Sequence, residues 1–282
     1  MKTKFLYMAL IVLGVNGFLI SCRNPWMERI TDSIVKGKKT GVMYDITAKT
    51  AAIINPDVNS LLVNDNVTII GETSDYTLYD NLSFTIPQGR ILIWNAIYRY
   101  YGSNTEAVAL NGDGDFKITG GIIESISNSI IAPSLFTGNI YMSGGKLDGQ
   151  ILTYDCTFTM TGGIINGNLT FLGQKATISG SSYITNASSG YTISFSNSPS
   201  KIIINGGHFE NTLTPDNVIF VNGQIYVYGS ATMNPDSIKK SNSSSSVSYC
   251  SSGTLLYFNT TFPSEFTLGT TLIVGQPPDW PW

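Results

Sequence analysis

A glycine-centred motif that returns at short intervals constrains the fold of this chain more than any other feature. Four copies carry a Gly-Gly pair and two weaker copies keep only the first glycine, which gives the series Gly120, Gly144, Gly162, Gly180, Gly206 and Gly229. Successive copies lie roughly 18–26 residues apart, and repeats of this length are small units that bury a face only by stacking on their neighbours. The spacing therefore predicts a solenoid.

Apolar residues alternate with other residues before each glycine. They lie four residues before it (Phe116, Ile140, Phe158, Ala176, Ile202, Ile225) and two residues before it (Ile118, Met142, Met160, Ile178, Ile204, Val227). This period of two indicates a half-buried strand. After the glycine the apolar position comes three residues on, at Ile123, Leu147, Ile165, Tyr183 and Phe209. An odd offset changes the face of a strand, so we expect a corner or bulge at the glycines.

A strand, a glycine corner and a second strand at a short period predict an all-β parallel β-helix. Stacked coils would place equivalent side chains in ladders at about 4.8 Å spacing, such as Met142 over Met160 over Ile178. The repeat resembles the pectin-lyase-like right-handed β-helix superfamily, in particular its adhesin-like and autotransporter-like bacterial surface proteins, over roughly residues 60–235. The resemblance implies a right-handed coil, and we expect capping strands at both ends. A glycine-rich β-sandwich is the alternative, although it gives no reason for repeated glycine corners.

The segment 1–21 predicts a signal peptide. Lys2 and Lys4 precede an apolar run from Phe5 to Ile20, which is typical of a secretory signal. Ser21 before Cys22 resembles the bacterial lipobox. That resemblance implies cleavage before Cys22 and attachment of lipid to its sulfur, with two or three acyl chains sufficing for stable anchoring. The alternative is an ordinary secreted protein with an incidental cysteine.

We therefore expect a signal peptide over 1–21, a lipidated tether over 22–41 and a single β-helix domain over 42–282. The basic residues of the tether fit either contact with anionic headgroups or a solvated linker. Within the domain we expect a capping element that ends near Asn55-Pro56-Asp57 and short strands at 61–63, 67–70 and 82–86. Regular coils are expected over about 61–233, a Ser-rich loop over 237–252 and a C-terminal cap over 253–282.

Charge and cysteine content narrow the classes of function. Without residues 1–21 the basic count falls from 16 to 14 against 19 acidic residues, a net charge near −5. This argues against nucleic acid as a partner, since basic patches dominate that affinity. Beyond Cys22 only Cys156 and Cys250 remain. A disulfide between them is permitted outside the cytoplasm, and two isolated cysteines are the alternative.

The sequence predicts no enzyme and no cofactor other than the lipid on Cys22. The resemblance implies that active members need a carboxylate cluster for Ca²⁺ with a basic residue, or grouped aspartates with His and Arg. Arg99 is the last arginine of the chain, and the only histidine, His208, lacks the sequence neighbours that those motifs require. No phosphate loop and no His/Cys spacing typical of a metal site is present.

Two sets of residues are candidates for binding. Four residues after the aligned glycine come Glu124, Asp148 and Asn166, with Ile184 and Glu210 at the same offset in later copies. If the coils stack, the first three form an outward polar column that either binds Ca²⁺ weakly, contacts sugar hydroxyls or is merely solvated. The outward tyrosines Tyr141, Tyr226 and Tyr228 either stack on sugar rings or are ordinary strand residues.

These observations predict a non-catalytic, lipid-anchored β-helix of the bacterial cell envelope, held on the outer membrane, with an adhesin-like or structural role. Its partners would be the membrane, through the anchor, and a glycan or an envelope or host surface protein. The alternative function is a carbohydrate-binding protein or a degenerate polysaccharide lyase.

Overall fold

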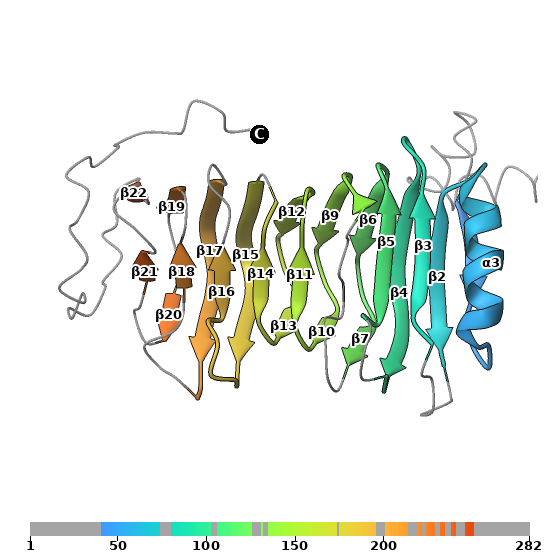
Figure 1. The fold of residues 1–282 in the computed structure, drawn as a ribbon, viewed down its shortest axis with the longest axis horizontal. Coiled ribbons are helices and arrows are strands. Elements are labelled where there is room, and N and C mark those ends of the chain that lie inside the picture. The colour runs from blue at the N-terminus through green and yellow to red at the C-terminus, as the bar shows by residue number, and fades with distance from the viewer. Residues whose placement is uncertain are drawn as a thin grey trace, which may run out of the picture. The chain divides into compact units, whose positions relative to one another are not determined.

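A computed structural model describes most of the chain between residues 41 and 250. The described residues are 41–73, 80–102, 106–125, 131, 135–173, 175–195, 201–213, 219–221, 224–228, 232–234, 238–240 and 246–250. From Val42 onward the chain forms a unit of its own. This unit is a parallel β-helix of about 6 turns, with one helix among its described residues (Figure 1). Every strand pair among the described residues is parallel, which excludes the antiparallel β-sandwich.

The larger sheet contains two ladders that lie end to end. Its first ladder consists of the first half of β4 (Ile91–Tyr100), β6 (Asp115–Ile118), β9 (Asn139–Met142), β12 (Thr157–Met160), the first halves of β15 (Lys175–Asn186) and β17 (Lys201–Asn211), β19 (Gln224–Tyr228) and β22 (Ser246–Cys250). Its second ladder consists of the second half of β4, β7 (Ile122–Ser125), β10 (Lys146–Asp148), β13 (Ile164–Asn166), the second halves of β15 and β17, and β20 (Thr232–Asn234). β1 (Val42–Asp45) and β2 (Val67–Glu72) continue this sheet at the N-terminal end.

Opposite strands close each coil. They are β3 (Leu82–Ile86), β5 (Val108–Gly112) and β8 (Leu135–Phe136), followed by β11 (Ile151–Thr153), β14 (Leu169–Phe171), β16 (Ile193–Phe195), β18 (Ile219–Val221) and β21 (Ile238–Lys240). Ile131 joins the two groups, because it forms bridges with both Val108 and Ile151.

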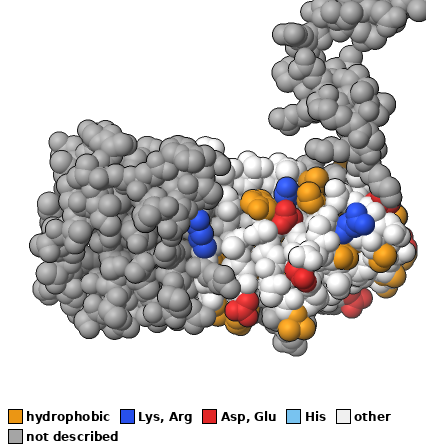
Figure 2. Space-filling view, turned by 90° about the horizontal axis from the view of Figure 1, so that it is seen from above, with side chains coloured by type: hydrophobic (Ala, Val, Ile, Leu, Met, Phe, Trp, Pro, Cys, Tyr) orange, Lys and Arg blue, Asp and Glu red, His pale blue; other side chains and the backbone are white. Residues whose placement is uncertain are grey.

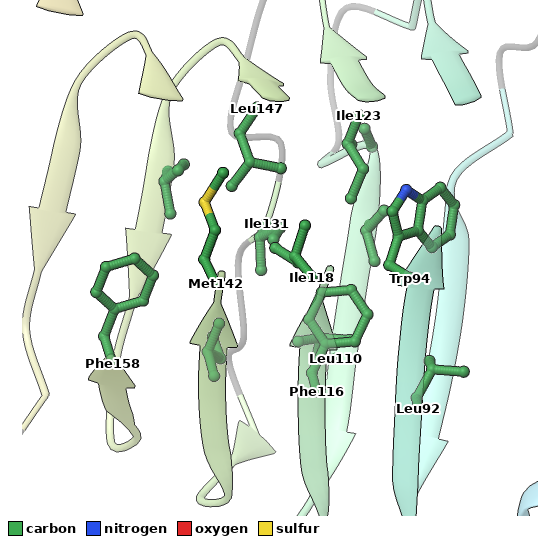
Figure 3. Packing of buried hydrophobic residues seen from close by; sticks show 14 of the residues in the cluster. Leu92, Trp94, Leu110, Phe116, Ile118, Ile123, Ile131, Met142, Leu147 and Phe158 are labelled. Carbon is green, nitrogen blue, oxygen red and sulfur yellow. The ribbon is translucent and has the colours of Figure 1, made fainter. Parts of the chain in front are cut away.

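The core is a set of apolar ladders that run through the coils. Phe116, Ile140, Phe158 and Ala176 stack in register, and so do Ile118, Met142, Met160 and Ile178, all of them buried. Figure 3 shows Phe116, Ile118 and Met142 beside Leu110 and Ile131, which come from the opposite side of the coils. The predicted ladder of Met142, Met160 and Ile178 is therefore confirmed.

The glycine pairs are corners between the two ladders. The second glycine of each full pair has a positive φ, as at Gly121 (+73°), Gly145 (+76°) and Gly163 (+91°). A Cβ on Gly145 would lie 2.7 Å from the carbonyl oxygen of Gly120 in the coil before it. Glycine is thus required here both by the backbone conformation and by the close approach of the neighbouring coil.

The corner at Gly180 contains one residue more than the others. Gly180 pairs with Gly206, but Tyr183 then pairs with His208 and Ile184 with Phe209, so a bulge lies between them. As a result Ile184 is buried and Tyr183 is on the outward face. Our placement of Tyr183 on the inward face, and of Ile184 in the outward column, is wrong because the inserted residue shifts the register by one.

A helix, α3 (Ala51–Leu62), takes the place of an opposite strand in the first coil. Its buried residues are Ala51, Ile54, Val58 and Leu62. The predicted capping element is present, but as strand β1 and this helix rather than as strands alone. The helix continues through Pro56 instead of ending near it, and it also replaces the strand that we expected at 61–63.

Two asparagines of α3 provide hydrogen bonds to the edge of β3. The Asn55 amide donates to the carbonyl oxygen of Asn81 (3.1 Å) and accepts from the N–H of Ser83 (2.9 Å). One turn later, Asn59 donates to the carbonyl oxygen of Ser83 (2.9 Å) and accepts from the N–H of Thr85 (2.8 Å). The two side chains thus satisfy backbone groups that a preceding strand would otherwise pair.

Strands at 67–72 and 82–86 agree with the sequence prediction. The expected Ser-rich loop over 237–252 is wrong in part, because β21 and β22 lie within it. The predicted cap over 253–282 lies outside the described residues, as do the signal peptide, Cys22 and the tether up to residue 40.

Candidate functional site

The outward face of the second ladder carries a polar column, which we call the acidic column. Glu124 of β7, Asp148 of β10 and Asn166 of β13 are in register on successive coils, as predicted. Thr185 and Glu210 continue the same column. Arg99 of β4 precedes it, opposite Glu124.

Neighbouring groups compensate the charges at the start of the acidic column. Arg99 Nη1 lies 2.6 Å from Glu72 Oε1, and Arg99 Nε lies 3.3 Å from Glu124 Oε2. Lys146 Nζ lies 2.6 Å from Asp148 Oδ2, and the Asn166 amide donates to Asp148 Oδ1 at 2.9 Å. Glu124 and Asp148 therefore each have a cationic partner, one coil away or on the same strand, so this face is polar without being strongly anionic.

A second cluster lies where the column reaches β15 and β17. The Tyr183 hydroxyl donates to Glu210 Oε2 at 2.9 Å, and His208 Nε2 lies 3.7 Å from that same oxygen. The Tyr183 and His208 rings stack with centroids 4.9 Å apart and planes inclined by 12°. The hydrogen bond to Glu210 is the main reason why the pKa of Tyr183 is raised, since it holds the phenol proton beside a carboxylate.

Sequence reasoning missed this Tyr183–His208–Glu210 cluster. His208 and Glu210 were visible as a pair two residues apart, which places both on one face of a strand. Tyr183 comes from the preceding coil, and the inserted residue after Gly180 concealed its outward position.

The candidate sugar-contact tyrosines belong to the first ladder. The backbone positions of Tyr141 and Tyr226 are in the same register, but Thr159, Thr177 and Ile203 separate them. Tyr228 lies two positions further along β19, opposite Asn205. The ammonium group of Lys117 lies 5.2 Å from the centre of the Tyr141 ring. The backbone of Tyr141 is therefore several coils away from that of Tyr226 and Tyr228, and stacking of these tyrosines on sugar stays a prediction.

Metal binding by three acidic, histidine or cysteine side chains has no support in the described residues, where no such group of three comes together. In the predicted Glu124–Asp148–Asn166 set, Lys146 and Asn166 already contact Asp148. Weak Ca²⁺ binding by this set stays a prediction.

Cys156 is a buried free thiol. Burial raises its pKa from 9.0 to about 12, because the thiolate would be poorly solvated. A thiol in this state is a packing residue rather than a nucleophile, and it does not form the disulfide with Cys250 that the sequence left open.

Figure 2 shows one face of the described part, where charged side chains of both signs lie scattered among uncharged groups. Among the described residues, no helix has the length and apolar character needed to cross a bilayer. Comparison of the chain with protein-family models, with curated proteins and with solved structures finds no match.

Proposed function

We propose that this chain is a non-catalytic, lipid-anchored β-helix of the bacterial cell envelope, with an adhesin-like or structural role. The observation that supports this proposal is the acidic column, in which Glu124 is paired with Arg99 of the preceding coil and Asp148 with Lys146 of its own strand. Carboxylates engaged in this way contribute a continuous polar surface, whereas catalysis by an acid and a base needs two groups held apart with different proton affinities.

The lipid anchor rests on the sequence from Lys2 to Cys22. We expect bacteria that express the full chain to incorporate an alkyne-labelled fatty acid into it and to retain it in the membrane fraction. Cys22→Ala should abolish both, whereas Cys250→Ala should leave both unchanged. Equal labelling of the Cys22→Ala variant would contradict the anchor.

The non-catalytic role is tested with the chain that begins at Arg23, incubated with a panel of acidic and neutral polysaccharides. Thermal shift reports binding, and the formation of new chain ends reports cleavage. We expect no new chain ends with any polysaccharide. New ends that require the folded protein would replace this proposal with a lyase or hydrolase.

Carbohydrate binding is the second candidate, and the shared register of Tyr141 and Tyr226 in the first ladder favours it. Tyrosine rings bind sugars by stacking, so Tyr141→Ala should remove any polysaccharide-induced thermal shift. Thr159→Ala, in the same column on the next coil, is the matched control. A thermal shift that both variants retain would contradict a role for this column.

A further inference from the structure

The Tyr183–His208–Glu210 cluster has no role in the proposed scaffold. It lies on the outward face of β15 and β17, and the side chains of His208 and Glu210 are 34% and 25% exposed. A packing role alone explains the ring stack, but it does not explain why an imidazole nitrogen and a phenol converge on one carboxylate oxygen.

We propose that this cluster binds a divalent transition-metal ion of the type that prefers imidazole, Zn²⁺ or Cu²⁺. The ligands are His208 Nε2 and Glu210 Oε2, and water completes the coordination. Tyr183 is a positioning residue that holds the Glu210 carboxylate through its hydrogen bond.

The distances fit a shared ion. Bonds from zinc to nitrogen or oxygen are about 2.0–2.2 Å long, so two ligand atoms of one ion lie up to about 4 Å apart. The His208 Nε2 and Glu210 Oε2 atoms are separated by 3.7 Å. They come from positions two apart on β17, where both side chains leave the same face of the strand, so a rigid sheet fixes their spacing.

The chemistry of the donors selects the metal. Imidazole binds Zn²⁺ and Cu²⁺ well, whereas Ca²⁺ and Mg²⁺ prefer a full set of oxygen ligands. The Tyr183 hydrogen bond (2.9 Å) orients the carboxylate from the neighbouring coil, as hydrogen-bonded partners of metal ligands commonly do. Stacking on Tyr183 likewise fixes the plane of the imidazole.

The His208 and Glu210 side chains are partly exposed, so an ion that they bind retains coordination positions for water or for a donor from another molecule. An ion held here would connect the outward face to a partner that supplies imidazole, carboxylate or phosphate oxygen. This role is independent of whether the chain is an adhesin or a structural protein.

The test exploits the fact that His208 is the only histidine of the chain. The full chain is prepared with a tag that contains no histidine and is titrated calorimetrically with Zn²⁺ and with Cu²⁺ in a buffer that does not bind metal. We expect a 1:1 site with at least one of the two ions. Electron spin echo measurements on the Cu²⁺ complex should then show modulation from one imidazole nitrogen, which only His208 can supply.

Variants separate ligands from the positioning residue. His208→Gln should weaken binding at least 10-fold and remove the imidazole modulation, in line with the loss typical of a removed ligand. Tyr183→Phe keeps the ring stack and removes the hydroxyl, so affinity should fall several-fold while the imidazole modulation remains. Asp113→Asn, at an exposed carboxylate in the turn before β6, is the matched control and should change neither.

Unchanged affinity in His208→Gln, a Cu²⁺ complex without imidazole modulation, or the absence of heat with both ions would each overturn the proposal. Circular dichroism of each variant verifies that the coils are intact. Because His208 and Tyr183 lie on the outward face, these substitutions leave the buried ladders unchanged.

Discussion

At the scale of single residues, the corner glycines are required for two reasons, a positive φ and the close approach of the neighbouring coil, and the two reasons can be separated. Gly145 has φ of +76°, and a Cβ there would lie 2.7 Å and 3.0 Å from carbonyl oxygens of Gly120 and Gly121. Gly89 has nearly the same φ, +74°, but a Cβ there would meet nothing within 4 Å. Comparison of substitutions at Gly145 and Gly89 therefore separates the effect of backbone strain from that of a steric clash between coils.

We expect Gly145→Ala to destabilise the fold by roughly 2–4 kcal/mol, since strain and overpacking add. Gly89→Ala should cost about 1 kcal/mol, from strain alone. Urea denaturation of both variants measures the two free energies. Equal losses would mean that the approach of neighbouring coils contributes nothing at the corner.

The thiol of Cys156 gives a residue-scale prediction about pH. Its pKa rises from 9.0 to about 12 on burial, so above pH 9 the unfolded chain releases a proton that the native state still holds. The contribution of the Cys156 thiol to the free energy of unfolding is fully present below pH 9. It decreases as the pH rises toward 12, by up to about 1.4 kcal/mol per pH unit. Cys156→Ala should lose stability less steeply over the same range. Parallel slopes in urea denaturation at pH 8 to 10.5 would contradict the assignment.

At the scale of elements, α3 shows where sequence reasoning fails and why. Its buried positions 51, 54, 58 and 62 follow a helical period, but Pro56 interrupts the pattern and favours a turn. Burial against the first coil outweighs the one backbone hydrogen bond that proline removes. Whether a helix or a strand forms at the end of a solenoid depends on what covers the terminal coil. A local sequence pattern does not contain that information.

The cap formed by Asn55 and Asn59 is testable as a unit. Replacing both with alanine removes four hydrogen bonds to β3 and the residue before it, which should cost roughly 2–6 kcal/mol because each net bond contributes about 0.5–1.5 kcal/mol. Hydrogen exchange should accelerate at the amides of Ser83 and Thr85. Asn64→Ala, at an exposed position after the helix, is the control. Unchanged protection of these two amides would show that the asparagines are dispensable.

At the scale of the whole unit, the coils are interchangeable where their registers agree. The step from Asn139 to Thr157 has the same length as the step from Thr157 to Lys175. Because of this regularity, the positions of the ladders and of the acidic column could be predicted from their distance to the corner glycines. Counting failed after Gly180, and it could not reveal the hydrogen bond from Tyr183 to Glu210, because these partners come from adjacent coils and lie far apart in the sequence.

We expect deletion of residues 157–174 to yield a folded β-helix that is one coil shorter. Ile140 would then stack on Ala176 and Met142 on Ile178, so both ladders continue. Deletion of Thr159 alone should instead disrupt the ladder at β12, because loss of one residue inside a strand turns the side chains that follow it to the opposite face. Circular dichroism and thermal melting compare the two. Equal melting temperatures would contradict the stacked register.

Coil length varies while the strand register stays constant. The step from Lys175 to Lys201 is longer than the step from Thr157 to Lys175, yet the same positions pair in both. One extra residue forms the bulge after Gly180, and others lie between the end of β15 and the start of β16, so the paired positions on either side of them stay in register. These connections can therefore differ in length and sequence from coil to coil while the ladders keep their pairing. A chain built this way can change the surface formed by its connections without a matching change in its buried ladders.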